Sequence, residues 1–350
     1  MQYRSLGRSG ITVSSVCLGT MTFGEQTDEA EAHRQLDLAL DAGVNFLDAA
    51  EAYPVPTKAA TQGETERQVG RWLKARGGRD KVIVATKVVG RADRFPYLRD
   101  GKPRLDAKNV AAALDASLQR LQTDYVDLYQ LHFPDRATNT FEIMGYAHKP
   151  DDDPIPIPET LAALGELVKA GKIRAVGVSN ETPWGVMTFL NAAAADPALP
   201  RIAAIQNPYS LVNRAFDIGL AEMAIKADCP LLAYSPLGFG TLTGKYRGGA
   251  RPPKARLTDY HAVWSRYLWP RAEQAQESYA ALARKHGLEP TALALAFAAA
   301  RPFMASVIVG ARTAAQLGEN LDLIERTRLS PEVLAEIDAI HALNPNPVLK

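Results

Sequence analysis

Short apolar segments alternate with longer segments of helical periodicity eight times between residues 15 and 325. Each apolar segment predicts a buried strand, and each longer segment predicts a helix with one apolar face. Alternation of this kind indicates a parallel sheet covered by helices, and eight short strands favour a closed (β/α)8 TIM barrel over an open sheet. The expected strand and helix pairs are 15–18 with 28–42, 45–48 with 65–74, 82–86 with 107–121, 126–131 with 158–170, 173–178 with 182–194, 202–206 with 217–226, 231–235 with 290–300, and 306–309 with 314–325.

The rest of the chain adds to this barrel. Residues 2–14 predict a β-hairpin that covers the barrel floor, residues 271–286 and 331–343 predict added helices, and the tail 344–350 is expected to be poorly ordered. A chain of this length fits one barrel domain over residues 1–350, although length alone leaves two domains open. A doubly wound Rossmann fold is the alternative architecture. Its GxGxxG signature is missing, because the nearest phrase, GTMTFG, has the wrong spacing.

Two segments are too long for ordinary connections between a strand and the next helix. Residues 133–157 contain DDDPIPIP, and residues 236–270 are rich in Gly, Pro and Arg with several aromatic residues. Both segments follow strands, so both leave the carboxyl end of the barrel, where ligands bind in this fold. We therefore expect them to cover a substrate and a cofactor.

Composition excludes several classes of protein. The chain has 40 Lys and Arg against 39 Asp and Glu, a net charge of +1, with no basic block, so nucleic acid is not expected as a partner. The two cysteines form no CxxC or Cys/His cluster, so neither a disulfide framework nor a metal site is expected. The first residues lack the apolar core of a signal peptide and no apolar run could span a membrane, which predicts a cytoplasmic protein without membrane contact. No feature indicates an oligomeric state.

Polar residues stand where three consecutive strands end. Asp48 closes the segment NFLD, Tyr53 follows in a small-residue loop, Lys87 closes VIVATK, and His132 closes VDLYQLH. Because the carboxyl ends of parallel strands converge, these four side chains are candidates for one site. Each also has a structural reading: Asp48 as a helix cap, Tyr53 as surface packing, Lys87 as a strand-end ion pair and His132 as a satisfied core histidine.

These strand ends resemble those of the aldo-keto reductase family, a group of (β/α)8 barrel enzymes, and in particular its bacterial Tas-type NADP(H)-dependent branch. The resemblance implies that Asp48, Tyr53, Lys87 and His132 form the catalytic tetrad. Position 49 is Ala where the family commonly has Thr, a difference that does not touch the proton chemistry. The matching phrases are CLGTMTFG (17–24), LDAAEAY (47–53), ATK (85–87), LYQLH (128–132), GKIRAVGVSNET (171–182), IQNPYSLVNR (205–214), AYSPLGFGTLTGKY (233–246) and IVGARTAAQLGEN (308–320).

Carbonyl reduction requires a proton donor at the oxygen and a hydride donor at the carbon. Tyr53 is the expected acid, and the Lys87 ammonium is expected to strengthen it by favouring the tyrosinate. Asp48 would keep Lys87 charged and oriented, and His132 would hydrogen-bond the carbonyl oxygen of a small-molecule substrate. None of the four side chains can supply a hydride, so a cofactor is required.

The resemblance implies NADPH as that cofactor. Ser179, Asn180 and Gln206 would hold the nicotinamide carboxamide, with Asp48 close to them, and Tyr234 would stack on the ring. The remaining expected contacts are Gly19, Thr20 and Met21 on the floor, Ser235, Leu237, Gly240, Leu242 and Lys245 along the pyrophosphate, and Gly310, Arg312, Gln316, Glu319 and Asn320 around the adenosine end. The purely structural interpretation of SPLGFG is a Gly-rich turn, and that of GVSN is a helix cap.

Three alternatives remain open on the sequence. Some family branches have a lysine at the position of Gly310 and an arginine at that of Gln316, so the choice between NADPH and NADH depends on whether Arg312 compensates. The family also includes cofactor-binding regulators such as potassium-channel β subunits, which can retain the tetrad. An unrelated barrel lyase with Lys87 as a Schiff base is a further reading, disfavoured by the cofactor phrases. The physiological substrate is not indicated.

Overall fold

The computed structural model describes all 350 residues and contains a closed barrel of eight parallel strands. Each strand pairs with its neighbour along the chain, and β10 closes the ring against β3, with Val307 opposite Val16 and Val309 opposite Leu18. The predicted barrel is therefore confirmed and the Rossmann alternative is wrong. The strands are β3 (Val16–Gly19), β4 (Phe46–Asp48), β5 (Ile83–Val88), β6 (Val126–Leu131), β7 (Ile173–Ser179), β8 (Ile202–Pro208), β9 (Leu231–Tyr234) and β10 (Met304–Val309).

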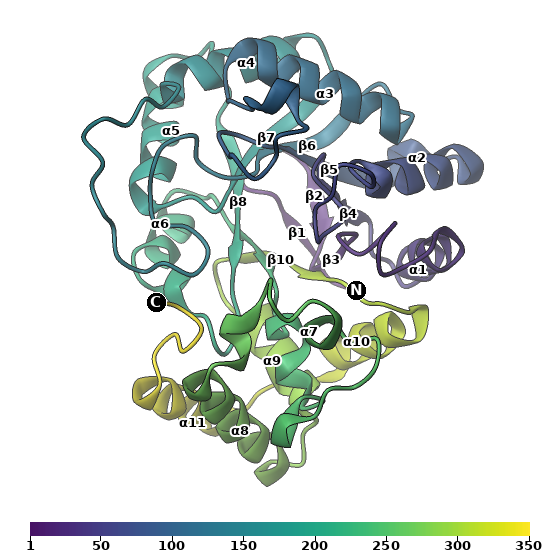
Figure 1. Cartoon of the computed structure of the whole chain (residues 1–350), viewed down its shortest axis with the longest axis vertical. Helices are drawn as coiled ribbons and strands as arrows, with labels where there is room; N and C mark the ends of the chain where they lie inside the picture. The colour runs from purple at the N-terminus through teal and green to yellow at the C-terminus, as the bar shows by residue number, and fades with distance from the viewer.

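Eight helices follow these strands and surround the barrel (Figure 1). Neighbouring helices pack side by side from α9 through α10 and α1 to α5, with α10 against α1. The bounds agree with prediction to within three residues; the sixth helix starts later because a short 3-10 turn, Ala215–Asp217, precedes it. The helices are α1 (Glu29–Asp41), α2 (Glu64–Arg76), α3 (Ala107–Leu121), α4 (Ile157–Lys169), α5 (Pro183–Ala195), α6 (Leu220–Lys226), α9 (Pro290–Ala299) and α10 (Ala314–Arg326).

Local sequence explains where these helices begin and end. The side chain of Asp28 caps α1 by accepting a hydrogen bond from the Glu31 amide at 2.9 Å, and Asp106 caps α3 in the same way. Gly43 ends the first unit with a φ of +84°, a left-handed conformation that glycine adopts without strain. Gly43 thereby sets where the chain leaves α1 and enters the next strand.

The hairpin of β1 (Tyr3–Ser5) and β2 (Thr12–Ser14) closes the amino-terminal end of the barrel, as expected. Leu6, Ile11 and Val13 are almost fully buried and belong to the same apolar cluster as barrel-interior residues such as Phe46 and Leu128. The floor is consequently a packed plug. Polar side chains that could carry chemistry inside the barrel therefore lie at the opposite, carboxyl end.

Three further helices lie outside the eight repeats. The first is a single turn, α7 (Arg256–Asp259), inside the long segment after β9, while α8 (Pro270–Lys285) and α11 (Pro331–Leu343) pack against each other (Figure 1). Both of the larger added helices confirm the prediction from sequence. No helix is both long enough and apolar enough to cross a membrane.

The carboxyl-terminal tail corrects one expectation, because it is packed against the protein. Val348 and Leu349 are at most 4% exposed, and Arg271 donates hydrogen bonds to the carbonyl oxygens of Pro347 and Leu349. The amide of Lys350 donates to the carbonyl of Glu142 at 2.6 Å. Two buried apolar side chains outweigh the local tendency of a Pro- and Asn-rich tail to stay in solvent.

Candidate functional site

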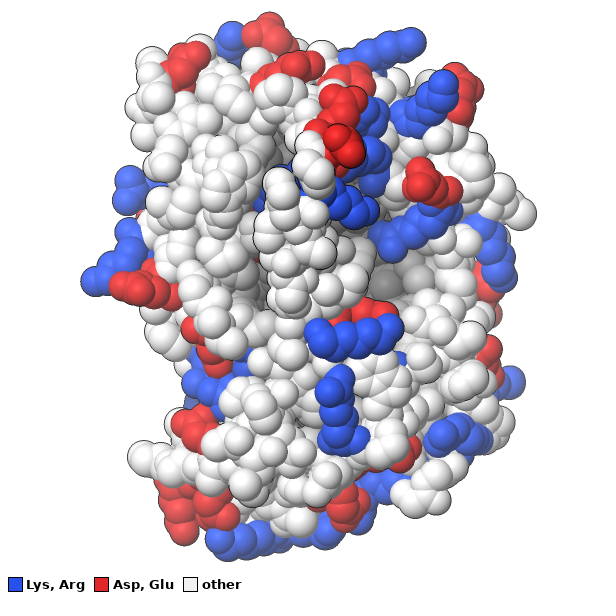
Figure 2. Space-filling view, turned by 60° about the vertical axis from the view of Figure 1, so that its left-hand side comes forward, with Lys and Arg blue, Asp and Glu red and all other residues white.

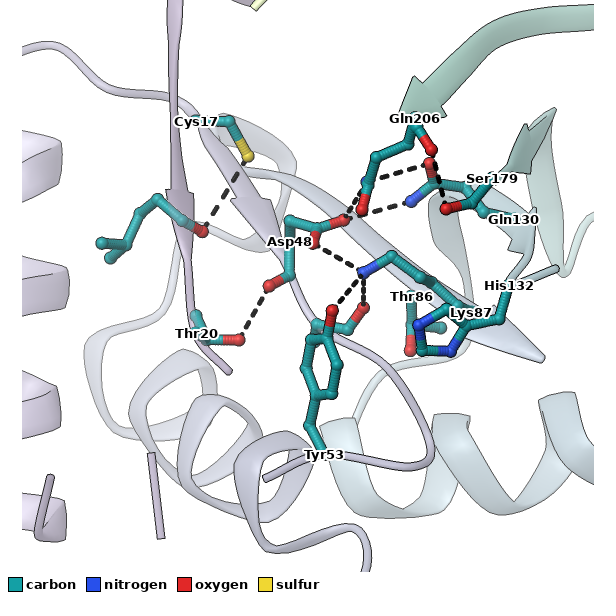
Figure 3. Close-up of polar contacts among 12 residues, drawn as sticks. Cys17, Thr20, Asp48, Tyr53, Thr86, Lys87, Gln130, His132, Ser179 and Gln206 are labelled. Atoms are coloured by element: carbon teal, nitrogen blue, oxygen red, sulfur yellow. Dashed lines mark hydrogen bonds and ion pairs between the residues drawn. The ribbon is translucent and has the colours of Figure 1, made fainter. Parts of the chain in front are cut away.

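Lys87 and Asp48 form a buried ion pair at the carboxyl ends of β5 and β4 (Figure 3). The Lys87 Nζ lies 2.6 Å from Asp48 Oδ2 and also donates to the carbonyl oxygen of Ala49 at 2.9 Å. Lys87 is 0% exposed and Asp48 is 2% exposed. Burial alone would lower the pKa of Lys87, but the charge of Asp48 and the Tyr53 hydroxyl raise it above the ordinary lysine value. The amine therefore remains an ammonium, which argues against a Schiff-base role.

Tyr53 lies over this pair, in the loop that follows β4. Its hydroxyl accepts a hydrogen bond from Lys87 Nζ at 3.2 Å, and the same ammonium lies 4.7 Å from the centre of the tyrosine ring. The ammonium thus touches the atom that would change charge if the hydroxyl lost its proton. It is placed to stabilise a tyrosinate.

The pKa of Tyr53 is raised, whereas the sequence led us to expect that Lys87 would lower it. Burial raises the pKa of the Tyr53 hydroxyl more than Lys87 lowers it, and Asp48 also raises it, so the pKa lies above its ordinary value. In the resting protein the hydroxyl therefore keeps its proton at neutral pH. Lys87 opposes the shift and limits it.

The second oxygen of Asp48 is held by two glutamine amides. Gln206 Nε2 donates to Asp48 Oδ1 at 2.8 Å, Gln130 Nε2 donates at 3.1 Å, and Gln206 also donates to Gln130 Oε1 at 3.1 Å (Figure 3). With Lys87 on the other oxygen, these bonds fix the carboxylate on both sides. Gln130 was not predicted. The sequence signal for it is strand alternation: in LYQLH a buried glutamine stands two residues before His132, on the face that points into the barrel.

His132 follows β6 and lies beside Tyr53, with ring centres 5.7 Å apart and planes at 81°. Its Nδ1 is buried without a hydrogen-bond partner. Burial, and then the positive charges of Lys87 and Arg94, hold the pKa of His132 well below its usual value, so the ring is neutral at pH 7. A neutral imidazole carries one N–H donor that a ligand at Tyr53 can accept.

A cavity of about 1100 Å³ extends from this tetrad to the amino-terminal end of α10. On the face shown in Figure 2 the molecule is hollowed, with basic side chains along the rim of the hollow. Nearly all the expected cofactor residues line the cavity: Gly19, Thr20, Met21, Asp48, Ser179, Asn180, Gln206, Tyr234, Ser235, Leu237, Gly240, Lys245, Gly310, Arg312, Gln316, Glu319 and Asn320. Leu242 is the exception, because its side chain packs into the apolar core at 4% exposure.

The tetrad end of the cavity carries amide and hydroxyl groups. Asn180 donates from Nδ2 to the His132 carbonyl at 2.9 Å, and its Oδ1 accepts from the Tyr234 hydroxyl at 2.7 Å. Ser179 donates to the Gln206 carbonyl at 2.8 Å. These contacts bring together, from β7, β8 and β9, the residues expected to face a nicotinamide carboxamide.

The far end of the cavity carries cations that no carboxylate neutralises. Lys245 Nζ and the Arg256 guanidinium make no hydrogen bond or ion pair within the protein, and burial lowers the pKa of Arg256 to about 10. Gly240 approaches Lys245 so closely that an added Cβ would lie 2.8 Å from Nζ, and its φ is +93°. Uncompensated cations beside a backbone cradle fit a pyrophosphate.

Sequence reasoning missed three arginines of the cavity wall: Arg94 in the segment after β5, Arg256 in α7 and Arg266 in the turn after it. Arg256 and Arg266 lie within residues 236–270, which were expected to cover the cavity as a whole without any inward-facing residue being assigned. Periodicity cannot assign direction in a segment without regular structure.

A barrel that holds a buried Lys–Asp pair against a tyrosine hydroxyl, at the end of a long cavity, has the site arrangement expected from the sequence for a barrel oxidoreductase. A comparison with protein families agrees: the model of the aldo/keto reductase family matches residues 15–342. The chain belongs to the aldo/keto reductase family. Membership makes it an oxidoreductase, and carbonyl reduction is the general reaction of that family.

Named relatives cover almost the whole chain. It is 49% identical to Protein tas of Escherichia coli (strain K12) over 347 residues, which is 99% of each chain. It is 33% identical to the uncharacterized oxidoreductase YrpG of Bacillus subtilis, over 97% of this chain and 96% of the relative. It is also 31% identical to a probable voltage-gated potassium channel subunit beta of Oryza sativa, over 99% and 98% of the two chains. The resemblance inferred from the sequence motifs is confirmed.

Proposed function

We propose that this protein is an NADPH-dependent reductase of aldehydes and ketones, with Tyr53 as the proton donor. The observation that carries the proposal is the contact of Lys87 Nζ with both Asp48 Oδ2 at 2.6 Å and the Tyr53 hydroxyl at 3.2 Å. NADPH, when bound, would supply the hydride. We further propose that residues 1–350 act as one domain in the cytoplasm, on a small-molecule carbonyl substrate and without nucleic acid.

The tetrad supplies the proton half of this reaction. A carbonyl oxygen that becomes an alkoxide needs a donor within hydrogen-bond distance, and Tyr53 holds its proton at neutral pH because burial raises its pKa. As the proton leaves the hydroxyl, Lys87 stabilises the tyrosinate that remains. Asp48 keeps Lys87 in place, and His132 offers a neutral N–H to the same carbonyl oxygen.

The cavity fits a dinucleotide phosphate in its chemistry. Its tetrad end offers amides and hydroxyls on Ser179, Asn180 and Gln206, and its far end offers cations on Lys245, Arg256 and Arg312. Phosphate requires such cations and a carboxamide requires such amides, so the two ends match the two ends of NADPH. Arg312 is the residue that we propose for the 2′-phosphate that distinguishes NADPH from NADH.

A regulatory role is the second candidate function. The observation that favours it is the 31% identity to a probable voltage-gated potassium channel subunit beta of rice over 99% of this chain. A regulator of this kind would bind the cofactor as a redox signal and turn it over slowly, and it would retain the same tetrad. The site geometry therefore fits both functions, and the rate of turnover separates them.

The decisive experiment measures NADPH oxidation against a panel of aldehydes and ketones, with NADPH and NADH affinity determined in parallel. Turnover with at least one class of carbonyl compound, and tighter binding of NADPH than of NADH, is expected. Tight NADPH binding without turnover of any compound would favour the regulatory role. The absence of nicotinamide binding would refute both functions.

A further inference from the structure

Arg94 lies on the wall of the cavity, in the segment between β5 and α3, and its guanidinium has no polar partner in the protein. It donates no hydrogen bond and has no carboxylate within ion-pair distance. Three aromatic rings hold it instead: its Cζ lies 5.1 Å from the ring centre of Phe95 and 5.0 Å from those of Phe133 and Phe141. Aromatic faces attract a cation without consuming its N–H donors. The donors of Arg94 thus remain free.

The segment that carries Arg94 is fixed to the catalytic loop. Arg99 forms a bidentate ion pair with the buried Glu51, with N–O distances of 2.6 and 2.9 Å, and also donates to the Val89 carbonyl at 2.8 Å. Glu51 lies two residues before Tyr53 in the same loop. This ion pair ties the segment that carries Arg94 to the loop that carries the proposed proton donor.

Arg94 lies beside the reacting end of the cavity. The ring of Phe133, on which its guanidinium rests, lies 5.5 Å from the ring of His132, and His132 lies 5.7 Å from Tyr53. Arg94 and His132 therefore both lie against the ring of Phe133, and the charge of Arg94 contributes to lowering the pKa of His132. The rings of Phe95, Phe133 and Phe141 form an apolar wall around this point.

Neither the cofactor nor a protein acid accounts for this cation. The candidates for phosphate binding, Lys245, Arg256 and Arg312, lie on the segments after β9 and β10, whereas Arg94 follows β5. The nearby acid on the cavity wall, Glu142, is already bound to Lys350 at 2.8 Å and to Arg266 at 3.3 Å. The guanidinium of Arg94 is exposed to the solvent of the cavity, so its donors are available to an anion from outside the protein.

We propose that Arg94 is a specificity-determining residue for carbonyl substrates that carry a carboxylate at the end of the molecule away from the carbonyl group. This inference rests on the proposed function and names its substrate class. The planar guanidinium can form a bidentate pair with the carboxylate, while the aromatic wall accepts the carbon skeleton. Neutral carbonyl compounds of the same shape gain only the apolar contact.

The test compares 4-carboxybenzaldehyde with 4-nitrobenzaldehyde, a neutral compound of nearly the same shape. Arg94→Gln should lower kcat/KM for the carboxylate about 10- to 100-fold, mainly through KM, because one charge-assisted pair is lost. The same variant should change kcat/KM for the nitro compound less than about 2-fold. Arg94→Lys, which retains the charge and loses the planar fork, should recover part of the loss.

Two controls separate this inference from the proposed function. Arg8→Gln removes the same charge from the opposite end of the barrel, where Arg8 is 65% exposed, and should affect neither compound. Affinity for the corresponding alcohols, 4-carboxybenzyl and 4-nitrobenzyl alcohol, is measured on the NADP-bound protein by calorimetry. Loss of carboxylate affinity in Arg94→Gln supports the subsite even if no aldehyde is turned over. Equal losses for the charged and neutral compounds, or no loss for either, would overturn it.

Discussion

Lys87 is the residue on which the site depends, because it is fully buried and touches both an acid and a phenol. Removing an ammonium from water is costly, and the cost is recovered only if every N–H finds a partner. Lys87 finds three, in Asp48, the Ala49 carbonyl and Tyr53. The third partner is the one that can change its charge during proton transfer.

At this scale the first prediction concerns Tyr53. Tyr53→Phe removes the acidic hydroxyl and keeps the ring beside His132, so turnover of aldehydes should fall by about two to four orders of magnitude. NADPH affinity should change little, because the variant retains the cations and amides of the cavity. Steady-state kinetics and fluorescence titration measure the two effects. A phenylalanine variant that keeps its activity would show that another group donates the proton.

The second prediction treats Asp48 and Lys87 as one unit. The double variant Asp48→Asn with Lys87→Met should be little less active than the worse single variant, because residues that act together are not additive. Each single variant should also lose about 3 to 5 kcal/mol of unfolding free energy, since it leaves one buried charge unpaired. Double-mutant cycles of kcat/KM and of urea unfolding check this.

An exposed pair provides the control for that cycle. Glu166 and Lys169 pair at 2.7 Å on α4 with side chains 73% and 61% exposed, and the same substitutions there should have little effect on either measurement. Fully additive losses at Asp48 and Lys87 would mean that the two residues act independently.

Among the elements, the turn between β10 and α10 is the one proposed to distinguish NADPH from NADH. Arg312 lies in this turn on the cavity wall, and its guanidinium donates to the Lys254 carbonyl in the covering segment. Arg312→Ala should weaken NADPH binding by about one to two decades, because one charge-assisted contact to the 2′-phosphate is lost, and should leave NADH nearly unchanged. The salt dependence of NADPH binding should flatten.

Binding titrations at several salt concentrations measure this, with Arg328→Ala, an exposed arginine just after α10, as control. If Arg312→Ala weakens both cofactors equally, the residue supports the shape of the turn through Lys254 and another residue selects the phosphate.

The tail and the segment 133–157 form a second coupled pair of elements. Lys350 exchanges backbone hydrogen bonds with Glu142 and Met144, at 2.6 and 2.9 Å, and Val348 and Leu349 are buried. Deleting residues 348–350 should lower the unfolding free energy by about 3 to 6 kcal/mol, from two lost apolar side chains. It should also raise KM for carbonyl substrates, because residues 140–143 line the cavity.

Urea unfolding and limited trypsin digestion measure these effects. Cleavage after Arg136, within the released segment, is expected in the deletion variant. Leu343→Ala serves as control because that side chain is 82% exposed. A deletion variant with unchanged stability and digestion would show that the tail only rests on the surface.

For the whole molecule, His132 makes stability depend on pH below neutrality. Its folded-state pKa lies well below the ordinary value of 6.5, so the unfolded chain binds a proton that the folded protein does not. Stability is therefore present above that ordinary value and is lost as pH falls towards the folded pKa, by up to about 1.4 kcal/mol per pH unit. His132→Gln should lose less stability than the parent protein between about pH 6.5 and pH 5. Urea unfolding across this pH range measures the free energy of unfolding. Equal pH slopes for His132→Gln and the parent protein would refute the prediction.

Much of this molecule could be predicted from its sequence, and the exceptions have physical causes. The barrel, its eight repeats and the meeting of Asp48, Tyr53, Lys87 and His132 followed from periodicity and from the ends of strands, which are local properties. The ordered tail did not, because its burial depends on Arg271 and Glu142, which are distant in the chain. Arg94 was missed for the same reason: three phenylalanines from two different segments determine where it points.

The hairpin that plugs the barrel floor has one more consequence. With Leu6, Ile11 and Val13 sealing that end, the tetrad can be reached only through the cavity at the opposite end. Two ligands that both need the bottom of a blind pocket cannot pass each other. Whichever ligand occupies the deeper position must bind first and leave last, so a floor built from three apolar side chains imposes an order of binding and release on any pair of ligands that share the pocket.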